Sequence, residues 1–299
     1  MPTLAEIPVI DQRGIEDRVA RIQSRSLKGD VKLAALKLAV SMLDITTLEG
    51  ADSPGKVRQM CQHAIQPTAS TVGVGSAAAV CVYPSMVAVA REVMNTHKSD
   101  VKVASVATAF PSGQAPLKLR LEEVKFAVDA GADEIDMVLS RGKFLSGQLE
   151  EVFEEVIQVK EACGKAHLKV IIETGELQTF DNIRIASELA MAAGADFIKT
   201  STGKASTNAT LANTLVMLHA IKDYHRSTGR MVGMKPAGGI GKAKQALHYL
   251  LMVREVLGAE WLSPERFRFG ASSLTRDLVM QIEKQVSGNY QSACYFAKD

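Results

Sequence analysis

The sequence Ala-Asp-Phe-Ile-Lys-Thr-Ser-Thr-Gly-Lys, residues 195–204, carries an apolar, strand-like segment to a lysine and then to a turn rich in hydroxyl groups. Lys199 therefore stands at the end of a predicted strand. Only the neutral form of an amine attacks a carbonyl, and an exposed lysine is about one part in a thousand neutral near pH 7.4. A nucleophilic Lys199 consequently needs a neighbour that lowers its pKa.

Lys235 is the candidate for this neighbour because it occupies the same kind of position. It follows the short run 231–234 and precedes Pro-Ala-Gly-Gly, residues 236–239. Two ammonium groups ~5 Å apart at an effective dielectric constant of ~20 repel by roughly 3 kcal/mol, which is worth about 2.4 pKa units. The alternative is that both lysines are surface residues at strand ends, and their matching positions make this alternative less favourable.

Short apolar runs alternate along the chain with longer segments of helical period, in eight successive pairs. Eight such pairs predict either a closed barrel or a doubly wound open sheet. The ends of several strands carry candidate functional residues, which favours a (β/α)8 TIM barrel because its strand ends meet around one site. The expected strands are 41–45, 78–83, 101–107, 134–139, 168–173, 197–200, 232–235 and 267–270, and the clearest helices are 117–130, 149–162, 182–193, 210–225 and 243–257.

The length of 299 residues fits one α/β domain over residues 1–299. Within it we expect an N-terminal helical extension over about 1–36 and a C-terminal tail over about 287–299. The hydrophobic fraction of 46% and the charged fraction of 23% are those of an ordinary globular protein. The acidic and basic residues near the N-terminus are unlike a secretory signal, so a cytoplasmic location is expected.

Charge and spacing argue against several other classes of protein. The formal net charge of +2, with scattered lysines, is unlike a nucleic-acid surface. No run approaches 18 uncharged apolar residues, so no membrane span is expected. The four cysteines lack disulfide spacing, and the six histidines lack metal-ligand spacing. We therefore expect neither a metal nor a cofactor, and any carbon–carbon chemistry must use an imine formed by the protein's own amine.

Two glycine-containing loops predict a phosphate site. Residues 236–241 read Pro-Ala-Gly-Gly-Ile-Gly and residues 270–273 read Gly-Ala-Ser-Ser, and each precedes a helical segment. Glycine permits close backbone approach, and helix N-termini bind anions. Barrels often bind phosphate after strands seven and eight, although such loops can also be simple turns. Gly203 and Lys204 could add a backbone donor and a charge.

Asp136 is an acid among β-forming apolar residues. A buried carboxylate is costly unless it is paired, and Lys199 or Lys235 could pair with it. An acid in this position could also relay protons during carbonyl addition and dehydration. A purely structural ion pair is the alternative interpretation.

Together these residues resemble the deoxyribose-phosphate aldolases, a family of class I Schiff-base aldolases. The resemblance runs from Leu-Asp-Ile-Thr-Thr-Leu at residues 43–48 to Phe-Gly-Ala-Ser-Ser-Leu at residues 269–274. Its most specific parts are residues 169–176, 197–204 and 235–239. The resemblance implies a metal-independent aldehyde-lyase of deoxyribonucleotide catabolism that cleaves 2-deoxy-D-ribose 5-phosphate reversibly into acetaldehyde and D-glyceraldehyde 3-phosphate.

The resemblance also implies roles for individual residues. Lys199 would form the Schiff base, Lys235 would lower its pKa, and Asp136 would act as acid and base through a water. The expected substrate and phosphate contacts are Asp44, Cys81, Lys169, Thr202, Gly203, Lys204, Gly238, Gly239, Gly270, Ser272 and Ser273.

Two features depart from the family pattern. Gly241 replaces an arginine that family members often carry, which weakens phosphate binding unless Lys242 compensates. The bacterial members end in a tyrosine that reaches the site, and here either Tyr290 or Tyr295 is the candidate for that role. The sequence is compatible with a homodimer or a higher homo-oligomer and does not choose between them.

Two other functions fit parts of the pattern. A transaldolase-like or fructose-bisphosphate-type aldolase would also use a lysine imine, and its donor substrate would differ. A non-catalytic barrel that binds sugar phosphates would keep the scaffold without forming an imine.

Overall fold

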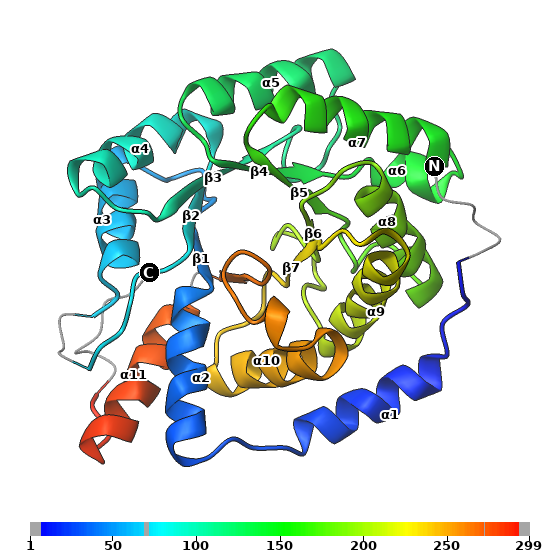
Figure 1. The fold of residues 1–299 in the computed structure, drawn as a ribbon. Coiled ribbons are helices and arrows are strands. Elements are labelled where there is room, and N and C mark those ends of the chain that lie inside the picture. Colours follow the sequence, from blue (N-terminus) through cyan, green and yellow to red (C-terminus); the bar gives the residue numbers. More distant parts are fainter. Residues whose placement is uncertain (1–6, 69–71, 272, 293–299) are drawn as a thin grey trace.

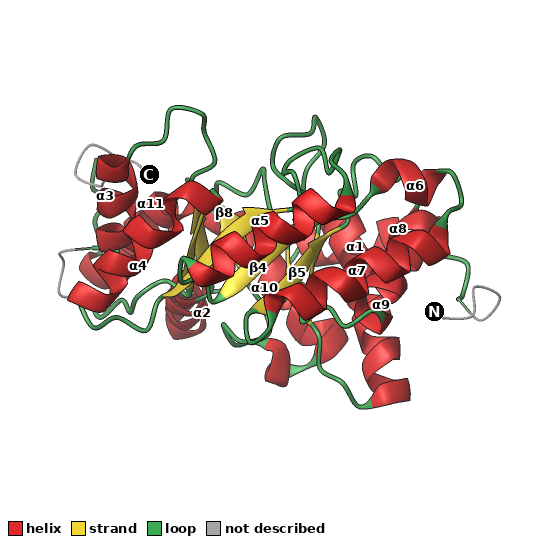
Figure 2. Cartoon of the chain, turned by 90° about the horizontal axis from the view of Figure 1, so that it is seen from above, coloured by secondary structure: helices red, strands yellow, loops and turns green. Residues whose placement is uncertain are grey.

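A ring of parallel strands surrounded by helices forms the body of the molecule in the computed structural model, which describes residues 7–68, 72–271 and 273–292 (Figures 1 and 2). All pairings between neighbouring strands are parallel, as alternating strands and helices require. The strands are β1 (Leu43–Thr46), β2 (Ala79–Val82), β3 (Lys102–Ala107), β4 (Glu134–Val138), β5 (His167–Ile171), β6 (Phe197–Lys199), β7 (Gly233–Lys235) and β8 (Phe269–Ala271).

The sheet closes into a barrel. The strand order is β7-β6-β5-β4-β3-β2-β1-β8, so the two ends of the sheet are β7 and β8. Parallel bridges between Met234 and Phe267 and between Ala237 and Gly270 join these ends. The predicted (β/α)8 barrel is therefore confirmed, and it leaves no open sheet edge among these strands.

Helices fill the connections between strands, and several begin and end where local sequence signals place them. Thr210 caps α9 by accepting a hydrogen bond from the amide of Asn213, and Gly229 ends the helix with φ of +74°. The helices are α3 (Pro54–Ile65), α4 (Val87–Thr96), α5 (Leu117–Asp129), α6 (Arg141–Leu145), α7 (Leu149–Cys163), α8 (Phe180–Ala192), α9 (Leu211–Thr228), α10 (Ala243–Leu257) and α11 (Leu274–Ser287), with short 3-10 turns at η2 (Pro84–Met86) and η3 (Ala259–Trp261).

Two helices precede the barrel, α1 (Gln12–Gln23) and α2 (Gly29–Ser41). Helix α1 packs on α9 and α10, and α2 packs on α10 and α11 (Figure 1). Glu255 of α10 ties the extension down, because it accepts hydrogen bonds from Arg18 and Arg25. Helix α2 continues five residues beyond the expected limit of the extension and leads directly into β1.

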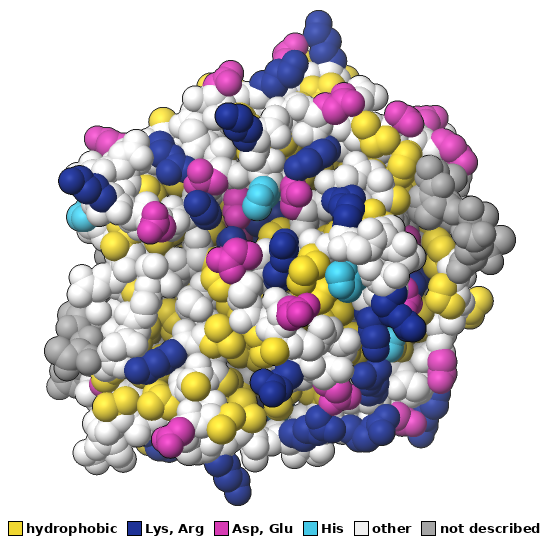
Figure 3. Space-filling model, in the orientation of Figure 1, with side chains coloured by type: hydrophobic (Ala, Val, Ile, Leu, Met, Phe, Trp, Pro, Cys, Tyr) yellow, Lys and Arg dark blue, Asp and Glu magenta, His cyan; other side chains and the backbone are white. Residues whose placement is uncertain are grey.

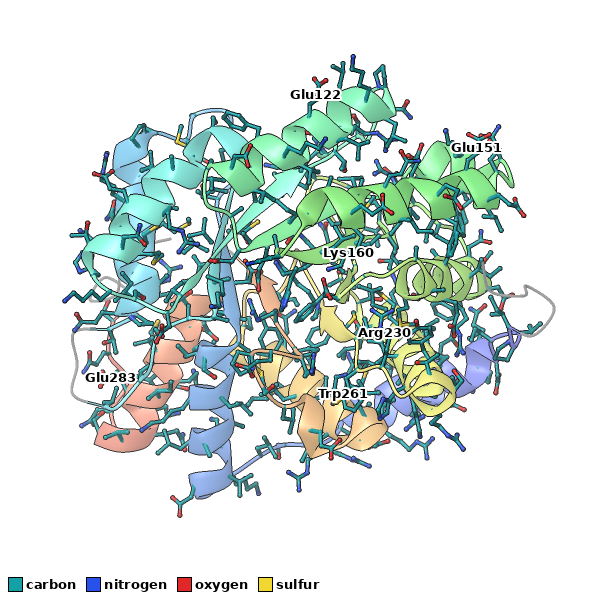
Figure 4. All side chains as sticks on the ribbon, turned by 45° about the horizontal axis from the view of Figure 1, so that its top comes forward. Glu122, Glu151, Lys160, Arg230, Trp261 and Glu283 are labelled. Carbon is teal, nitrogen blue, oxygen red and sulfur yellow. The ribbon has the colours of Figure 1, made fainter. Side chains whose placement is uncertain are left out.

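The strands present two different faces. On β4, Ile135 and Met137 belong to the main hydrophobic core between the strands and the helices. Glu134 and Asp136 alternate with them and are equally buried, on the opposite face, inside the barrel. By contrast, Glu122 of α5 and Glu151 of α7 point away from the barrel (Figure 4). Among the described residues, no helix is both long and apolar enough to cross a membrane.

Candidate active site

Asp136 lies at the centre of a buried cluster of charged side chains inside the barrel. Its Oδ2 atom accepts hydrogen bonds from the Nζ atoms of Lys199 at 2.7 Å and Lys235 at 2.8 Å. Its Oδ1 atom accepts one from Lys169 at 2.7 Å. The structure therefore brings the three predicted catalytic residues into direct contact.

Strand register explains why the lysines meet. Lys199 and Lys235 are directly paired across β6 and β7, so their side chains leave the sheet at the same level. The two ammonium nitrogens lie 2.7 and 2.8 Å from the same oxygen atom. They are therefore at most about 5.5 Å apart, the sum of these two distances. Without a counter-charge, two like charges at this separation repel by about 3 kcal/mol at an effective dielectric constant of ~20.

Further charges extend the cluster on its other sides. Lys169 pairs with Glu134 at 2.6 Å, and Glu134 pairs with Arg268 at 3.0 Å. Lys235 also pairs with Asp44, whose Oδ1 atom has no hydrogen-bond partner in the described part of the chain. The cluster thus holds four cations and three carboxylates, and one positive charge is in excess. The four cations are Lys169, Lys199, Lys235 and Arg268, and the carboxylates are Asp44, Glu134 and Asp136.

The carboxylates of the cluster are held in their ionised form. Burial acts to raise the pKa of Asp136, but the ammonium groups of Lys169, Lys199 and Lys235 outweigh it and hold this pKa well below its usual range. Burial also opposes ionisation of Glu134, yet Lys169 and Arg268 lower its pKa to about 2. Both acids are therefore anions at neutral pH.

Lys235 is held as a cation by the same balance. Burial acts to lower its pKa, but the carboxylates of Asp136 and Asp44 outweigh burial and raise the pKa above the usual lysine value. Space for its side chain comes from Gly270, since a Cβ atom at that position would lie 3.0 Å from Cε of Lys235 and 2.7 Å from Cβ of Ala237. Lys235 is consequently a fixed positive charge beside Lys199.

A cavity of about 340 Å³ opens above this cluster at the carboxyl ends of the strands. Lys199 is the one member of the charge cluster that lines it. Seven of the predicted substrate contacts also line the cavity. Its lining residues are Thr46, Leu48, Glu49, Lys199, Thr202, Gly203, Lys204, Ala237, Gly238, Gly239, Ile240, Gly241, Gly270, Ala271 and Ser273.

Three predicted substrate contacts do not line the cavity. Asp44 and Lys169 are fully buried in the charge cluster. Cys81 is also fully buried, and desolvation together with the nearby charge of Asp136 raises the pKa of its thiol to about 12. The cysteine is therefore a neutral thiol at physiological pH.

The structure leaves two of the predictions about the C-terminal part without a test. Ser272 and Tyr295 lie outside the described residues. Tyr290 is 63% exposed, and the ammonium group of Lys284 lies 3.7 Å from the centroid of its ring. In this arrangement Tyr290 contacts α11 and does not line the cavity.

The backbone that follows β7 forms part of the cavity wall. The amide of Gly239 donates to no acceptor within the described residues, whereas the amide of Gly238 already donates to the carbonyl of Gly270 at 3.1 Å. Gly238 has φ of +78°, and a Cβ atom there would lie 2.8 Å from Asn208, so only glycine fits this turn. Ser273, which directly precedes α11, belongs to the lining, so the N-terminus of this helix lies beside the cavity and favours negative charge there.

Lys204 and Glu49 form an ion pair at the cavity. The Nζ atom of Lys204 lies 2.8 Å from Oε1 of Glu49, and both residues belong to the lining. Lys242, the residue expected to compensate for the missing arginine at Gly241, is absent from this lining and lies 3.9 Å from Asp277 instead. Lys204 is therefore the cation of the lining that is available to an anion on this side.

Sequence reasoning missed three charged residues of the site, Glu49, Glu134 and Arg268. Glu134 and Arg268 belong to the buried cluster, and Glu49 pairs with Lys204. Glu173 accepts hydrogen bonds from the amide and the hydroxyl of Thr202, which shapes the turn after β6. The spacing of two between Glu134 and Asp136 was a usable signal, because it places both carboxylates on one face of a strand. No group of acidic, histidine and cysteine side chains suited to a metal ion occurs among the described residues.

A (β/α)8 barrel with a lysine at a strand end, beside a second lysine and a carboxylate and lining a cavity, has the features of an aldolase that uses an amine nucleophile. The comparison with known families agrees with this class. The model for the DeoC/LacD family aldolases matches residues 34–274, and the chain belongs to that family.

Individual relatives agree over most of the chain. It is 46% identical to mouse deoxyribose-phosphate aldolase over 291 residues, which covers 94% of this chain and 91% of the relative. It is 46% identical to the human protein of the same name over 283 residues, covering 91% and 89% of the two chains.

Solved structures share the fold. A crystal structure from Toxoplasma gondii ME49 has a TM-score of 0.75 at 22% identity and covers 90% of this chain and all of the other. The deoxyribose phosphate aldolase from Aeropyrum pernix, described as tetrameric, has a TM-score of 0.62 at 25% identity and covers 92% of this chain and 99% of the other.

The lowered pKa of Glu134 predicts a pH-dependent contribution to stability. A carboxylate whose pKa is lowered by folding stabilises the protein above its unfolded pKa, and this contribution disappears as the pH falls through the folded pKa. Glu134→Gln should therefore lower the free energy of unfolding at pH 7, by a few kcal/mol. The difference from the wild type should shrink between about pH 4.5 and pH 2, the two ends of the shift.

Denaturant unfolding at a series of pH values measures this difference. Glu122→Gln, an exposed change on α5, is the matched control and should leave the curve unchanged (Figure 4). If the difference in free energy of unfolding between Glu134→Gln and the wild type stays constant across the acid range, the charge of Glu134 does not stabilise the fold.

Proposed function

We propose that the protein cleaves 2-deoxy-D-ribose 5-phosphate reversibly into acetaldehyde and D-glyceraldehyde 3-phosphate, with Lys199 as the Schiff-base residue. The observation that carries this proposal is the position of Lys199, which lines the cavity and shares an oxygen of Asp136 with the fixed cation Lys235. The names of the relatives and their extensive coverage support the choice of substrate.

In the synthetic direction, the neutral amine of Lys199 adds to the carbonyl carbon of acetaldehyde. Loss of water gives an imine, and loss of a proton from the methyl group gives an enamine. The enamine carbon then attacks the aldehyde of glyceraldehyde 3-phosphate and forms the new carbon–carbon bond. Addition of water to the resulting imine releases the product and restores the amine of Lys199.

Asp136 is suited to move protons in these steps. Its carboxylate touches the reacting nitrogen at 2.7 Å, so it can stabilise the cationic imine and exchange protons through a water beside Lys199. Because three ammonium groups lower the pKa of Asp136, its resting form is the anion, which accepts a proton in the first instance. Lys169 and Glu134 hold the carboxylate in place from the other side and act as positioning residues.

The phosphate group would lie in the part of the cavity that Gly239 and Lys204 line. There the amide of Gly239, the N-terminus of α11 and the ammonium group of Lys204 would offer hydrogen bonds and positive charge. The free protein pairs Lys204 with Glu49, so an incoming phosphate competes with that carboxylate. Gly203, Gly238 and Ser273 also line the cavity.

Reduction of the imine tests the proposal directly. Incubation with acetaldehyde and borohydride should add one ethyl group to the protein, and peptide mass spectrometry should locate it on Lys199. Lys199→Ala should abolish the adduct, while Lys165→Ala, a change of an exposed lysine, should leave it intact.

Other outcomes of the trapping experiment favour the rival functions. Turnover of dihydroxyacetone phosphate without activity toward acetaldehyde would indicate a fructose-bisphosphate-type aldolase. A protein that binds sugar phosphates and traps no aldehyde on any lysine would be a non-catalytic barrel.

The charge of Lys235 should control the pH dependence of the reaction. Lys235→Leu removes the positive charge beside the amine of Lys199, so turnover at neutral pH should fall by roughly tenfold or more and the acid limb of the pH–rate profile should move to higher pH. Activity should recover as the pH increases. Lys235→Arg retains the charge and should keep the acid limb of the pH–rate profile near its original position.

Unfolding measurements must accompany this comparison, because Lys235→Leu leaves Asp44 buried without its partner. A folded Lys235→Leu protein whose pH–rate profile is that of the wild type would remove Lys235 from the proposed role.

Lys204 and Glu49 should affect phosphate binding in opposite directions. Lys204→Ala should raise KM for the phosphorylated sugar by roughly tenfold with a much smaller change in kcat. Glu49→Gln removes the competing carboxylate and should lower KM. Steady-state kinetics with 2-deoxyribose, which lacks the phosphate, is the control, and equal effects on both sugars would contradict the assignment.

A cytoplasmic location and a homodimer or larger homo-oligomer stay predictions, and the tetrameric Aeropyrum pernix protein is a precedent for assembly within the fold.

A further inference from the structure

A second cavity, of about 440 Å³, lies on the outer side of the barrel. Its walls come from α2, α10, α11 and the segment that joins α1 to α2, and these helices lie side by side in Figure 1. It has no lining residue in common with the catalytic cavity. The lining consists of Arg25, Ser26, Leu27, Lys32, Lys242, Ala243, Lys244, Leu247, His248, Leu251, Asp277 and Gln281.

The floor of this outer cavity is mainly apolar. Ala243 and Leu247 are buried, and Leu27 and Leu251 are partly buried and pack against the hydrophobic core. Such a surface favours a ligand with an apolar body, because covering it removes apolar area from water. The volume falls within the ~300–1,000 Å³ that is usual for small-molecule sites.

The rim of the outer cavity is strongly basic. Four cations line the cavity with one carboxylate, Asp277, whose Oδ2 atom already accepts the amide hydrogen of Ala243 at 2.6 Å. Arg25 forms an ion pair at 2.6 Å with Glu255, which does not line the cavity. Lys32 and Lys244 form no ion pair within the described residues. Figure 3 shows basic side chains among apolar atoms over the area where α2 and α10 lie in Figure 1.

We propose that the outer cavity binds an organic phosphate monoester that carries an apolar or aromatic body. The phosphate group would lie against Lys32 and Lys244, and the body would cover Leu247 and Leu251. An inorganic anion would leave the apolar floor in water, and an uncharged apolar molecule would leave the two lysines unpaired. This inference does not depend on the proposed aldol reaction, because none of these residues takes part in it.

Binding of 1-naphthyl phosphate to the full-length protein tests the proposal, with isothermal calorimetry as the measurement. The double variant Lys32→Glu with Lys244→Glu should weaken binding by roughly tenfold or more. The matched control, Lys118→Glu with Lys125→Glu, changes two exposed lysines on α5 and should bind as the wild type does. Inorganic phosphate and 1-naphthol should each bind at least roughly tenfold more weakly than 1-naphthyl phosphate.

The design separates the two cavities. Lys204→Ala alters the catalytic cavity and should leave binding of 1-naphthyl phosphate unchanged. Loss of binding in Lys204→Ala and retention in the Lys32 and Lys244 variant would place the probe in the catalytic cavity and overturn the proposal. Equal weakening in both double variants, or no binding to the wild type, would overturn it too.

Discussion

The carboxylate of Asp136, shared by three lysines, is the interaction on which the site depends. Without it, Lys169, Lys199 and Lys235 would be three ammonium groups packed inside a barrel, an arrangement that burial and mutual repulsion would both oppose. With it, and with Asp44 and Glu134, the cluster retains a single excess positive charge. Lys199 is the member of this cluster that reaches the cavity.

Charge in this barrel is therefore divided between two levels. Below the cavity, ion pairs fix Lys169 and Lys235 as cations and Glu134 and Asp136 as anions, so these groups provide constant charges. At the cavity wall, Lys199 and Lys204 each have one carboxylate partner, which the proposed function would have them exchange for substrate. The buried level is costly to assemble, and the strands that carry it are correspondingly surrounded by a continuous apolar core.

Much of this could be predicted from the chain alone. The helix expected over residues 243–257 is observed as α10 with those bounds, and all eight expected strands occur. The position of Lys199 and Lys235 at strand ends identified them as a pair, and the loops after strands seven and eight line the cavity. The sequence could not show whether Lys169 lines the cavity or lies in the barrel interior, because a lysine near a strand end reaches one or the other according to which way its side chain turns. Glu49 and Lys204 are 155 positions apart, and nothing local links them.

The sequence by itself determined the alternation of strands and helices, the lysines at matching strand ends and the glycines where backbone must come close, because these follow from periodicity and from the conformational range of single residues. Only the tertiary structure decided which charges share a partner, which lysine touches the cavity and where a second basic cavity forms between α2, α10 and α11. Ion pairing depends on distances of a few ångströms between residues remote in the chain, and such distances exist only after the barrel has closed.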